Sequence, residues 1–148
     1  MRNILIIHTG GTFGMTPIEP EEQLAPGNIQ DQILKYIPEI EKIADIDVVI
    51  PFNLDSSNIG VNEWEVLSGI IDENLAKYDG FVIIHGTDTM VYSASALSYS
   101  LRNLPKPVIF TGSQRPLSKL RTDARFNLID AIELATMPAP EVLITFVL

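Results

Sequence analysis

The sequence contains no cysteine and only two histidines, and its apolar runs are short. The absence of cysteine excludes disulfides and thiolate metal sites and is typical of a cytoplasmic protein. Two histidines without carboxylates at ligand spacing give no metal signature. No run approaches the ~20 apolar residues of a membrane helix, and the first run, residues 4–7, is shorter than the ~7–15-residue core of a signal peptide. We therefore expect a cytoplasmic protein with no membrane segment and no metal.

Basic residues are also scarce, since 10 of them against 19 acidic residues give a formal net charge of −9. Such a chain neutralises phosphates poorly, so we expect no nucleic acid partner. One basic cluster is interpreted as a solvated rim or a subunit contact rather than a nucleic-acid groove. Its members are Lys106, Arg115, Lys119, Arg121 and Arg125.

A length of 148 residues suits one compact domain. Five apolar runs rich in Ile, Val and Phe do not alternate with polar residues, which is typical of strands buried on both faces of a parallel sheet. These runs cover residues 4–7, 48–50, 81–84, 108–110 and 142–148.

Helical patterns separate most of these runs, over residues 28–37, 64–77 and 90–104 and again after residue 123. Asn62 and Glu65 have the spacing of a capping box for the second helix, and Thr122 or Asp123 is expected to cap the fourth. Alternating strands and helices predict an α/β fold with a doubly wound, flavodoxin-like, mainly parallel sheet and helices on both faces, in three layers. Residues 16–26 hold three prolines and no periodicity, so we expect a mobile surface loop there.

Small, hydroxylated or carboxylate-bearing residues follow four of the predicted strands. In an open parallel sheet the carboxyl ends of the strands lie at one edge, where ligands bind. Taken alone, Gly10 and Gly11 are explained by a tight turn, and Asp88 or Thr89 by the cap of the next helix. Capping needs one oxygen per helix, however, and these segments supply many. Together they predict a ligand site made by residues 8–12, 53–58, 85–89 and 111–114.

Hydroxyls beside a carboxylate suit a nucleophile and a polar clamp. His8 and His85 also lie at strand ends, where a buried histidine bonded to the backbone is favoured over a catalytic one. A threonine nucleophile needs a base, and a carboxylate such as Asp88 is a weak one, so a lysine kept neutral by burial is expected. None of the lysines, at positions 35, 42, 77, 106 and 119, falls in a strand-end segment. The residues alone therefore predict an incomplete catalytic site.

Five segments carry a family resemblance: HTGGT at 8–12, LDSSN at 54–58, HGTDTM at 85–90, KPVIFTGSQRP at 106–116 and RTDARFNLIDA at 121–131. In this order they resemble the bacterial-type L-asparaginases, most closely the cytoplasmic type I branch. The resemblance covers almost the whole chain, and TGGT together with HGTDT is far more specific than either motif alone. It implies that residues 1–148 are the family's N-terminal α/β domain.

The resemblance implies a hydrolase that converts asparagine to aspartate and ammonia through a threonine nucleophile and an acyl-enzyme. It further implies no cofactor or metal and a homo-oligomer, either a dimer or a tetramer. Thr12 corresponds to the nucleophile, and Thr87 and Asp88 correspond to the pair that acts with a lysine. The positions that correspond to substrate-binding groups are Asp55, Ser56, Gly86 and Ser113.

Three features of the family have no counterpart in this sequence. The family's catalytic lysine lies beyond the fifth strand, and its smaller C-terminal domain completes a neighbouring subunit's site; the sequence reaches neither. Many members also have a tyrosine after the nucleophile, whereas residues 16–26 contain none and have Glu22 or Leu24 nearest that position. We therefore expect little or no activity from these 148 residues alone and activity from a longer parent.

Three other interpretations stay open. The first is a relative that deamidates glutamine or an amide on tRNA, which the pocket around Ser56 and Ser113 would distinguish. The second is a non-catalytic α/β module that binds small amino acids without turnover. The third is an interaction module, which leaves the polar strand ends unexplained.

Overall fold

The computed structural model describes residues 1–15 and 26–148, so almost all of the loop expected over residues 16–26 lies outside the described residues. In the described part, five parallel strands form one sheet in the order β2-β1-β3-β4-β5. The strands are β1 (Arg2–His8), β2 (Ala44–Val49), β3 (Gly80–Ile84), β4 (Val108–Thr111) and β5 (Val142–Ile144). Each of the five apolar runs contributes one strand, as predicted.

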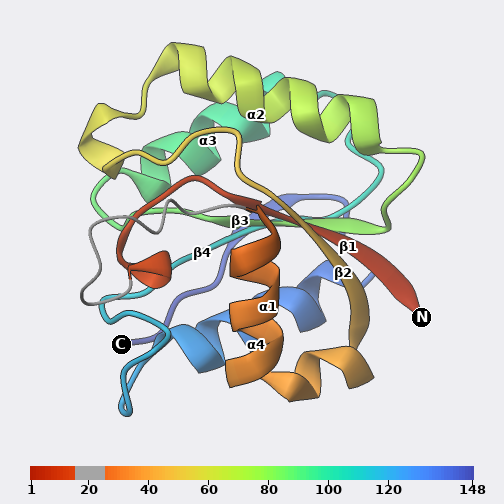
Figure 1. Cartoon of the computed structure of the whole chain (residues 1–148). Helices are drawn as coiled ribbons and strands as arrows, with labels where there is room; N and C mark the ends of the chain where they lie inside the picture. The colour runs from red at the N-terminus through yellow and green to blue at the C-terminus, as the bar shows by residue number, and fades with distance from the viewer. Residues whose placement is uncertain (16–25) are drawn as a thin grey trace.

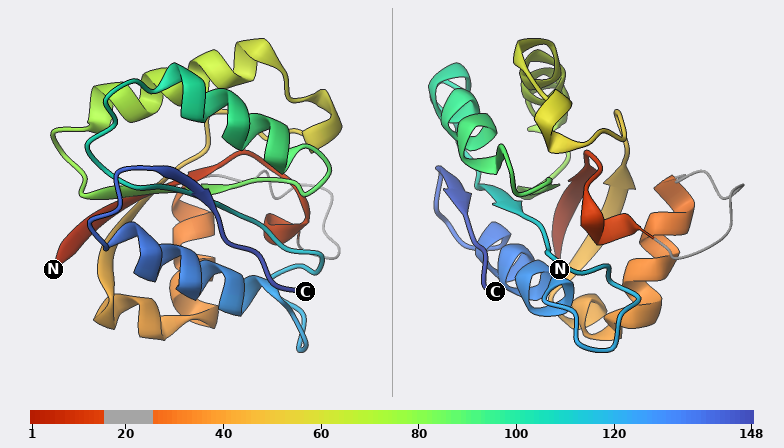
Figure 2. Two further views of the ribbon diagram at one scale, coloured as in Figure 1. Left: turned by 180° about the vertical axis from the view of Figure 1, so that it is seen from behind. Right: turned by 90° about the vertical axis from the view of Figure 1, so that its left-hand side faces the viewer.

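Helices cover both faces of the sheet (Figure 1). On one face lie α2 (Val61–Asn74) and α3 (Met90–Ser100), and on the other α1 (Pro26–Tyr36) and α4 (Ala124–Ala135). Figure 2 shows the three layers from two further directions. The strand order is that of flavodoxin-like sheets, so the predicted doubly wound, three-layer α/β fold is confirmed.

Alternate residues of β1, which has a neighbouring strand on each side, lie in two separate hydrophobic cores. Ile4 and Ile6 belong to the core that includes α1 and α4, whereas Leu5 and Ile7 belong to the core that includes α2 and α3. None of these four side chains is more than 1% exposed. Because successive residues of a strand point to opposite faces, burial on both faces requires an unbroken apolar run.

The two strands that differ most from their predicted bounds are the edge strands of the sheet, β2 and β5. β2 begins at Ala44 rather than Val48, because the exposed residues Asp45 and Asp47 interrupt the apolar pattern. β5 ends at Ile144, and its residues are partly buried or exposed. An edge strand needs fewer apolar residues than a central one, so an apolar run locates its ends poorly.

The side-chain caps predicted for α2 and α3 are wrong. At α2, the carboxylate of Glu63 accepts a hydrogen bond from the N–H of Gly60 (2.8 Å), so the helix starts before the predicted cap, Asn62. Thr89 does not cap α3, because its hydroxyl donates to the carbonyl of Ser56 (2.7 Å) instead. A side chain predicted to serve its own helix therefore joins two strand-end segments.

At α4, one of the two predicted caps is confirmed. The hydroxyl of Thr122 accepts from the N–H of Ala124 (3.0 Å), whereas Asp123 makes no capping bond.

Over residues 1–15 and 26–148, none of the helices combines the length and the apolar character that crossing a membrane requires.

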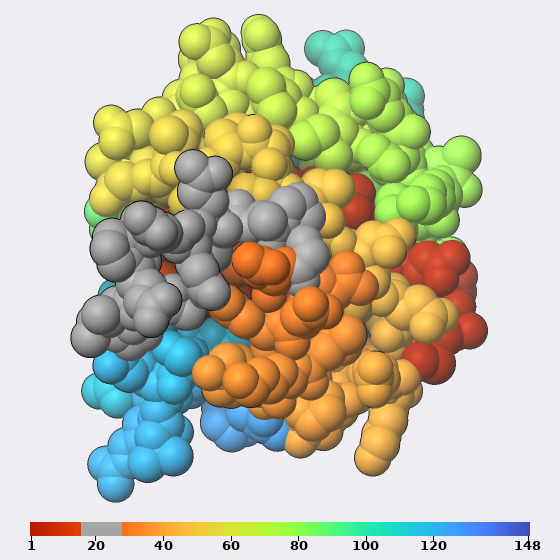
Figure 3. Space-filling view, viewed as in Figure 1, coloured from red at the N-terminus to blue at the C-terminus, as the bar shows by residue number. Residues whose placement is uncertain are grey.

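The predicted basic cluster is not a single surface. Lys106 precedes β4, at the amino end of that strand, and donates to the carbonyls of Leu75 and Tyr78. The four other members of the cluster follow the carboxyl end of β4. The loop of residues 112–123, blue in Figure 3, projects from the molecule, and its Leu120 is 100% exposed. Lys106 therefore stabilises the chain just after α2 and does not belong with the others.

Gly80, at the start of β3, packs against α4 with no room for a side chain. A methyl group there would lie 2.2 Å from the carbonyl oxygen of Ala135. We expect Gly80→Ala to lower the free energy of unfolding by about 1–3 kcal/mol, because α4 must shift away from the sheet.

Gly69→Ala is the matched control, since a methyl group on Gly69 would meet no atom within 4 Å. In the interior of α2, alanine should raise the free energy of unfolding by about 0.5–1 kcal/mol. Urea denaturation measures both changes. A Gly80→Ala variant as stable as the wild type would contradict the close packing.

Candidate active site

The carboxyl ends of β1 and β3 lie side by side where the strand order reverses, which is where doubly wound sheets bind ligands. A cavity of about 350 Å³ opens there. All four polar strand ends contribute to its lining. The lining residues are Gly11, Thr12, Met15, Asn53, Leu54, Asp55, Ser56, Gly86, Thr87, Asp88 and Gln114.

Two glycines turn the chain from β1 into the cavity. Gly10 and Gly11 have φ angles of 119° and 81°, which favour glycine. A methyl group on Gly10 would lie 2.3 Å from the carbonyl oxygen of Leu54, and one on Gly11 would lie 3.0 Å from Cα of Gly86. The predicted tight turn is confirmed, and it brings Thr12 beside the end of β3.

Hydrogen bonds between distant segments hold the cavity walls together. Thr9 donates its N–H to the carbonyl of Ile84 (3.0 Å), and its own carbonyl accepts from the N–H of Leu54 (2.9 Å). Ser56 is only 4% exposed and packs on Gly86, where a methyl group would lie 2.7 Å from the serine hydroxyl. The positions of the lining groups therefore depend on the assembled sheet.

Asp55 presents an exposed carboxylate to the cavity. One of its oxygens accepts hydrogen bonds from the hydroxyl (2.7 Å) and the N–H (2.9 Å) of Ser57. These two bonds, the hydroxyl's first, hold the pKa of Asp55 below its ordinary value. An ionised, pre-aligned carboxylate of this kind suits the ammonium group of a ligand.

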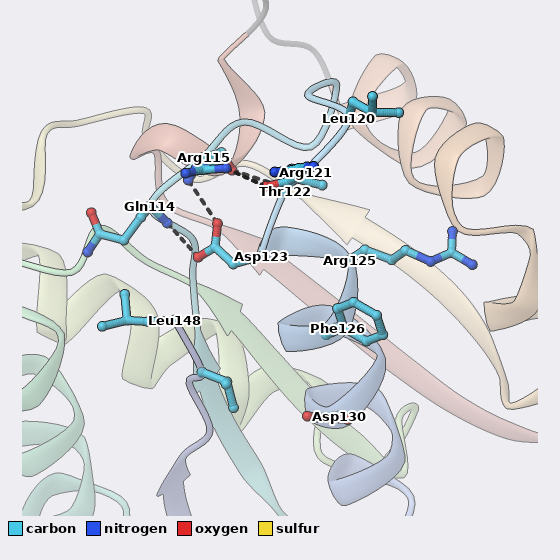
Figure 4. A pocket seen from close by; sticks show the side chains of 11 residues that line it. Gln114, Arg115, Leu120, Arg121, Thr122, Asp123, Arg125, Phe126, Asp130 and Leu148 are labelled. Carbon is cyan, nitrogen blue, oxygen red and sulfur yellow. Dashed lines mark hydrogen bonds between the residues drawn. The ribbon is translucent and has the colours of Figure 1, made fainter.

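Gln114 lines the cavity and lies in the predicted segment 111–114, but the sequence-based prediction gave it no role of its own. Its side-chain amide donates to the hydroxyl of Thr87 (3.1 Å). The carboxylate of Asp123 supports this loop by accepting from the N–H groups of Gln114 (2.7 Å) and Arg115 (3.0 Å), as Figure 4 shows. The feature of the sequence that indicated Gln114 is its place in the polar segment 111–114, which follows the apolar residues of β4.

Ser113, its neighbour, is the one predicted site residue that does not line the cavity. Its side chain is 5% exposed, and its hydroxyl has no hydrogen-bond partner within the described ranges. The roles of all the predicted site residues stay predictions. The six of them that do line the cavity are Thr12, Asp55, Ser56, Gly86, Thr87 and Asp88.

Both histidines are buried behind the cavity and bonded to backbone, as expected. His8 accepts on Nδ1 from the N–H of Gly10 (3.2 Å), while its Nε2 has no partner in the part of the chain that the structure describes. Burial lowers the pKa of His8 to about 4. Nδ1 of His85 lies 2.7 Å from the carbonyl oxygen of Gly86. Neither ring lines the cavity.

A larger hollow of about 900 Å³ lies beside the loop of residues 112–123 (Figure 4). Its walls include the exposed apolar side chains of Leu120, Phe126 and Leu148. It shares Gln114 with the smaller cavity but contains none of the predicted site residues. We therefore assign the candidate site to the smaller cavity.

Within the described part of the chain, the smaller cavity offers hydroxyl, carboxylate, amide and backbone groups, and no lysine or histidine lines it. Lys77, for example, is bonded to Asp47 and Tyr78 instead. Among residues 1–15 and 26–148, no three His, Asp or Glu side chains are grouped so that they could hold a metal ion. The described groups suit the binding of a small polar molecule with charged ends.

These features define a doubly wound α/β protein whose ligand cavity combines threonine hydroxyls from two strand ends with acidic side chains. The family model described as "Asparaginase, N-terminal" matches residues 3–147, and the chain belongs to the asparaginase family. The chain is 43% identical over 150 aligned residues to L-asparaginase 1 of Escherichia coli (strain K12), across 98% of this chain and 44% of that protein.

Two further relatives agree with this assignment. The solved structure of Vibrio cholerae L-asparaginase I matches with a TM-score of 0.85 and 40% identity, across 98% of this chain and 44% of that one. A glutamyl-tRNA(Gln) amidotransferase chain of Pyrococcus abyssi is 35% identical over 142 residues, across 95% of this chain and 32% of that protein. The chain spans less than half the length of these relatives. The family resemblance predicted from the five segments is confirmed.

His8 should make the stability of the fold depend on pH. Histidine titrates near pH 6.5 when unfolded, whereas His8 in the folded chain has a pKa of about 4. The contribution of neutral His8 is therefore complete above about pH 6.5 and is lost as the pH falls to about 4, a change of about 3 kcal/mol.

His8→Asn keeps an acceptor oxygen for the N–H of Gly10 but does not titrate. Between about pH 7 and pH 4, we expect the free energy of unfolding to fall by about 3 kcal/mol more in the wild type than in the variant. Urea denaturation at each pH measures the difference. Equal losses in the two proteins would contradict a buried, neutral His8.

Proposed function

We propose that the cavity is the substrate site of an L-asparagine amidohydrolase, which converts asparagine to aspartate and ammonia. The observation that carries the proposal is that Thr12 and Thr87, from the ends of different strands, line one cavity together with Asp88. Membership of the asparaginase family supports it, because relatives that match almost the whole chain are named L-asparaginases.

In this proposal, Asp55 and Ser56 hold the α-amino and α-carboxylate groups of the substrate. The carboxylate of Asp55 pairs with an ammonium group, and the hydroxyl of Ser56 donates to a carboxylate. Gly86 lies against Ser56, where a side chain would close the space. Binding of the amino-acid end on this side leaves the side-chain amide for the threonines.

The proposed reaction has two steps. The hydroxyl of Thr12 attacks the side-chain amide carbon, the amide nitrogen gains the proton that the hydroxyl loses, the C–N bond breaks to release ammonia, and an ester forms between substrate and enzyme. Water then attacks the ester, which releases aspartate and restores the hydroxyl. Thr87 and Asp88 activate the nucleophile or the water. Because the amide of Gln114 donates to Thr87, the threonine's own hydrogen stays available for another partner.

The lining residues that the structure describes do not include an efficient acceptor for the threonine proton. A threonine hydroxyl ionises far above neutral pH, and carboxylates such as Asp55 and Asp88 are weak bases. The proposal therefore includes a base from outside the cavity lining, a lysine if this protein follows the family resemblance. We expect the 148 residues to bind the ligand and to show little or no turnover.

A second candidate is hydrolysis of glutamine or of an amide on tRNA, and the match to the glutamyl-tRNA(Gln) amidotransferase chain favours it. Glutamine is one methylene longer than asparagine, and a difference of that size changes binding by only ~10–200-fold. Measured substrate preference therefore has to separate the two.

We further propose a cytoplasmic location, self-association into a dimer or tetramer and no nucleic acid partner for an asparaginase.

Calorimetry with aspartate tests the proposed binding site. We expect the wild-type chain to bind aspartate and Asp55→Asn to weaken binding about 10–100-fold, because the variant loses a charged partner for the ligand's ammonium group. Asp45→Asn is the matched control, since Asp45 is an exposed residue near the amino end of β2, whereas the cavity lies at the carboxyl ends of the strands. No aspartate binding by the wild type, or equal weakening by both variants, would refute this site.

Ammonia release from asparagine and from glutamine tests the reaction. We expect little or no release from asparagine by these 148 residues, and any release should be lost in Thr12→Ala, because the variant lacks the nucleophile. Faster release from glutamine would favour the second candidate. Undiminished release by Thr12→Ala would show that another group performs the chemistry.

A further inference from the structure

A series of hydrogen bonds through the buried residues Ser93 and His85 connects α2 to the backbone of the candidate site. The indole Nε1 of Trp64, on α2, lies 2.9 Å from Oγ of Ser93 on α3, and that oxygen lies 2.9 Å from Nε2 of His85. The other ring nitrogen, Nδ1, lies 2.7 Å from the carbonyl oxygen of Gly86, which lines the cavity. Ser93 and His85 are 0% and 1% exposed, so water does not compete for the bond between them.

The chemistry of the two ends determines the direction of every bond in the series. An indole N–H can only donate, so Ser93 accepts from Trp64; a carbonyl can only accept, so Nδ1 of His85 carries a hydrogen. Burial lowers the pKa of His85, and a neutral imidazole has one N–H, which leaves Nε2 as an acceptor. Ser93 must therefore donate to Nε2.

The last bond orients the peptide that joins Gly86 to Thr87. The C=O and N–H of a trans peptide point in opposite directions, so a Gly86 carbonyl held by the buried ring turns the N–H of Thr87 away from that ring. Glycine accepts many backbone conformations. This peptide therefore needs a constraint from outside the backbone, and the ring of His85 supplies one.

We propose that Trp64, Ser93 and His85 are positioning residues that hold the Gly86–Thr87 peptide in the orientation that the candidate site needs. None of the three lines the cavity, so they act through the peptide and not on the ligand. The order of the hydrogen bonds is independent of the proposed function, whereas the effect on ligand binding rests on it. The sequence has a single tryptophan, so one indole signal reports on the first bond.

The tautomer of His85 tests the bond order directly. Long-range ¹H–¹⁵N spectra of the ligand-free 148-residue chain near pH 7 should show the hydrogen on Nδ1 and a bare Nε2. A hydrogen on Nε2 would reverse the Ser93 bond and overturn the proposal.

Two serine variants test whether the series reaches the site. Ser93→Ala removes its middle member, whereas Ser68→Ala removes a different bond between the same two helices, from Ser68 to Ser100 (2.9 Å). Only Ser93→Ala should shift both the indole signal and the amide signals of Gly86 and Thr87. Equal shifts of those amides in both variants, or no shift in either, would overturn the proposal. If Ser93→Ala does not fold, Trp64→Phe removes the first donor and must shift the same two amides.

Aspartate binding tests the functional part. Ser93→Ala should weaken binding about five- to tenfold, the value of one net hydrogen bond, while Ser68→Ala leaves it unchanged. Unchanged binding by Ser93→Ala would refute the positioning effect on the ligand. If the wild type does not bind aspartate at all, the proposed function fails, and the tautomer and the amide shifts still decide whether the three residues position the peptide.

Discussion

Gly11 and Gly86 touch backbone to backbone where β1 and β3 end, and the candidate site depends on that contact. A methyl group on Gly11 would lie only 3.0 Å from Cα of Gly86. A side chain there would push the two strand ends apart and separate Thr12 from Thr87. The strand order creates the condition for this contact, because β1 and β3 are neighbours at the point where the winding reverses.

Two side-chain hydrogen bonds at the site join different strand ends. The hydroxyl of Thr89 donates to the carbonyl of Ser56, and the amide of Gln114 donates to the hydroxyl of Thr87. Such bonds form only when the sheet is complete, so folding and preorganisation of the site use the same contacts. A site built in this way has few local sequence signals beyond the residue types themselves.

The strands were predictable to the extent that they are buried. Central strands such as β1 need apolar residues on both faces, and an unbroken apolar run follows from that need. The edge strand β2 alternates, so its first residues, including Asp45, escaped the prediction. At α2, Glu63 and Glu65 both lie near the start of the helix, and the path of the chain through Gly60 decided that Glu63 bonds to its N–H.

The sequence by itself determined the parallel α/β fold and the four polar strand ends, because burial and turn formation leave periodic and local patterns, and the resemblance of five segments to a known family indicated the family. Only the tertiary structure decided that Gln114 rather than Ser113 lines the cavity and that Asp123 supports a loop instead of capping its helix. It likewise decided the direction of the hydrogen bonds that reach His85. The physical reason is that a hydrogen bond depends on the distance and orientation of two groups, and residues far apart along a chain acquire those only when it folds.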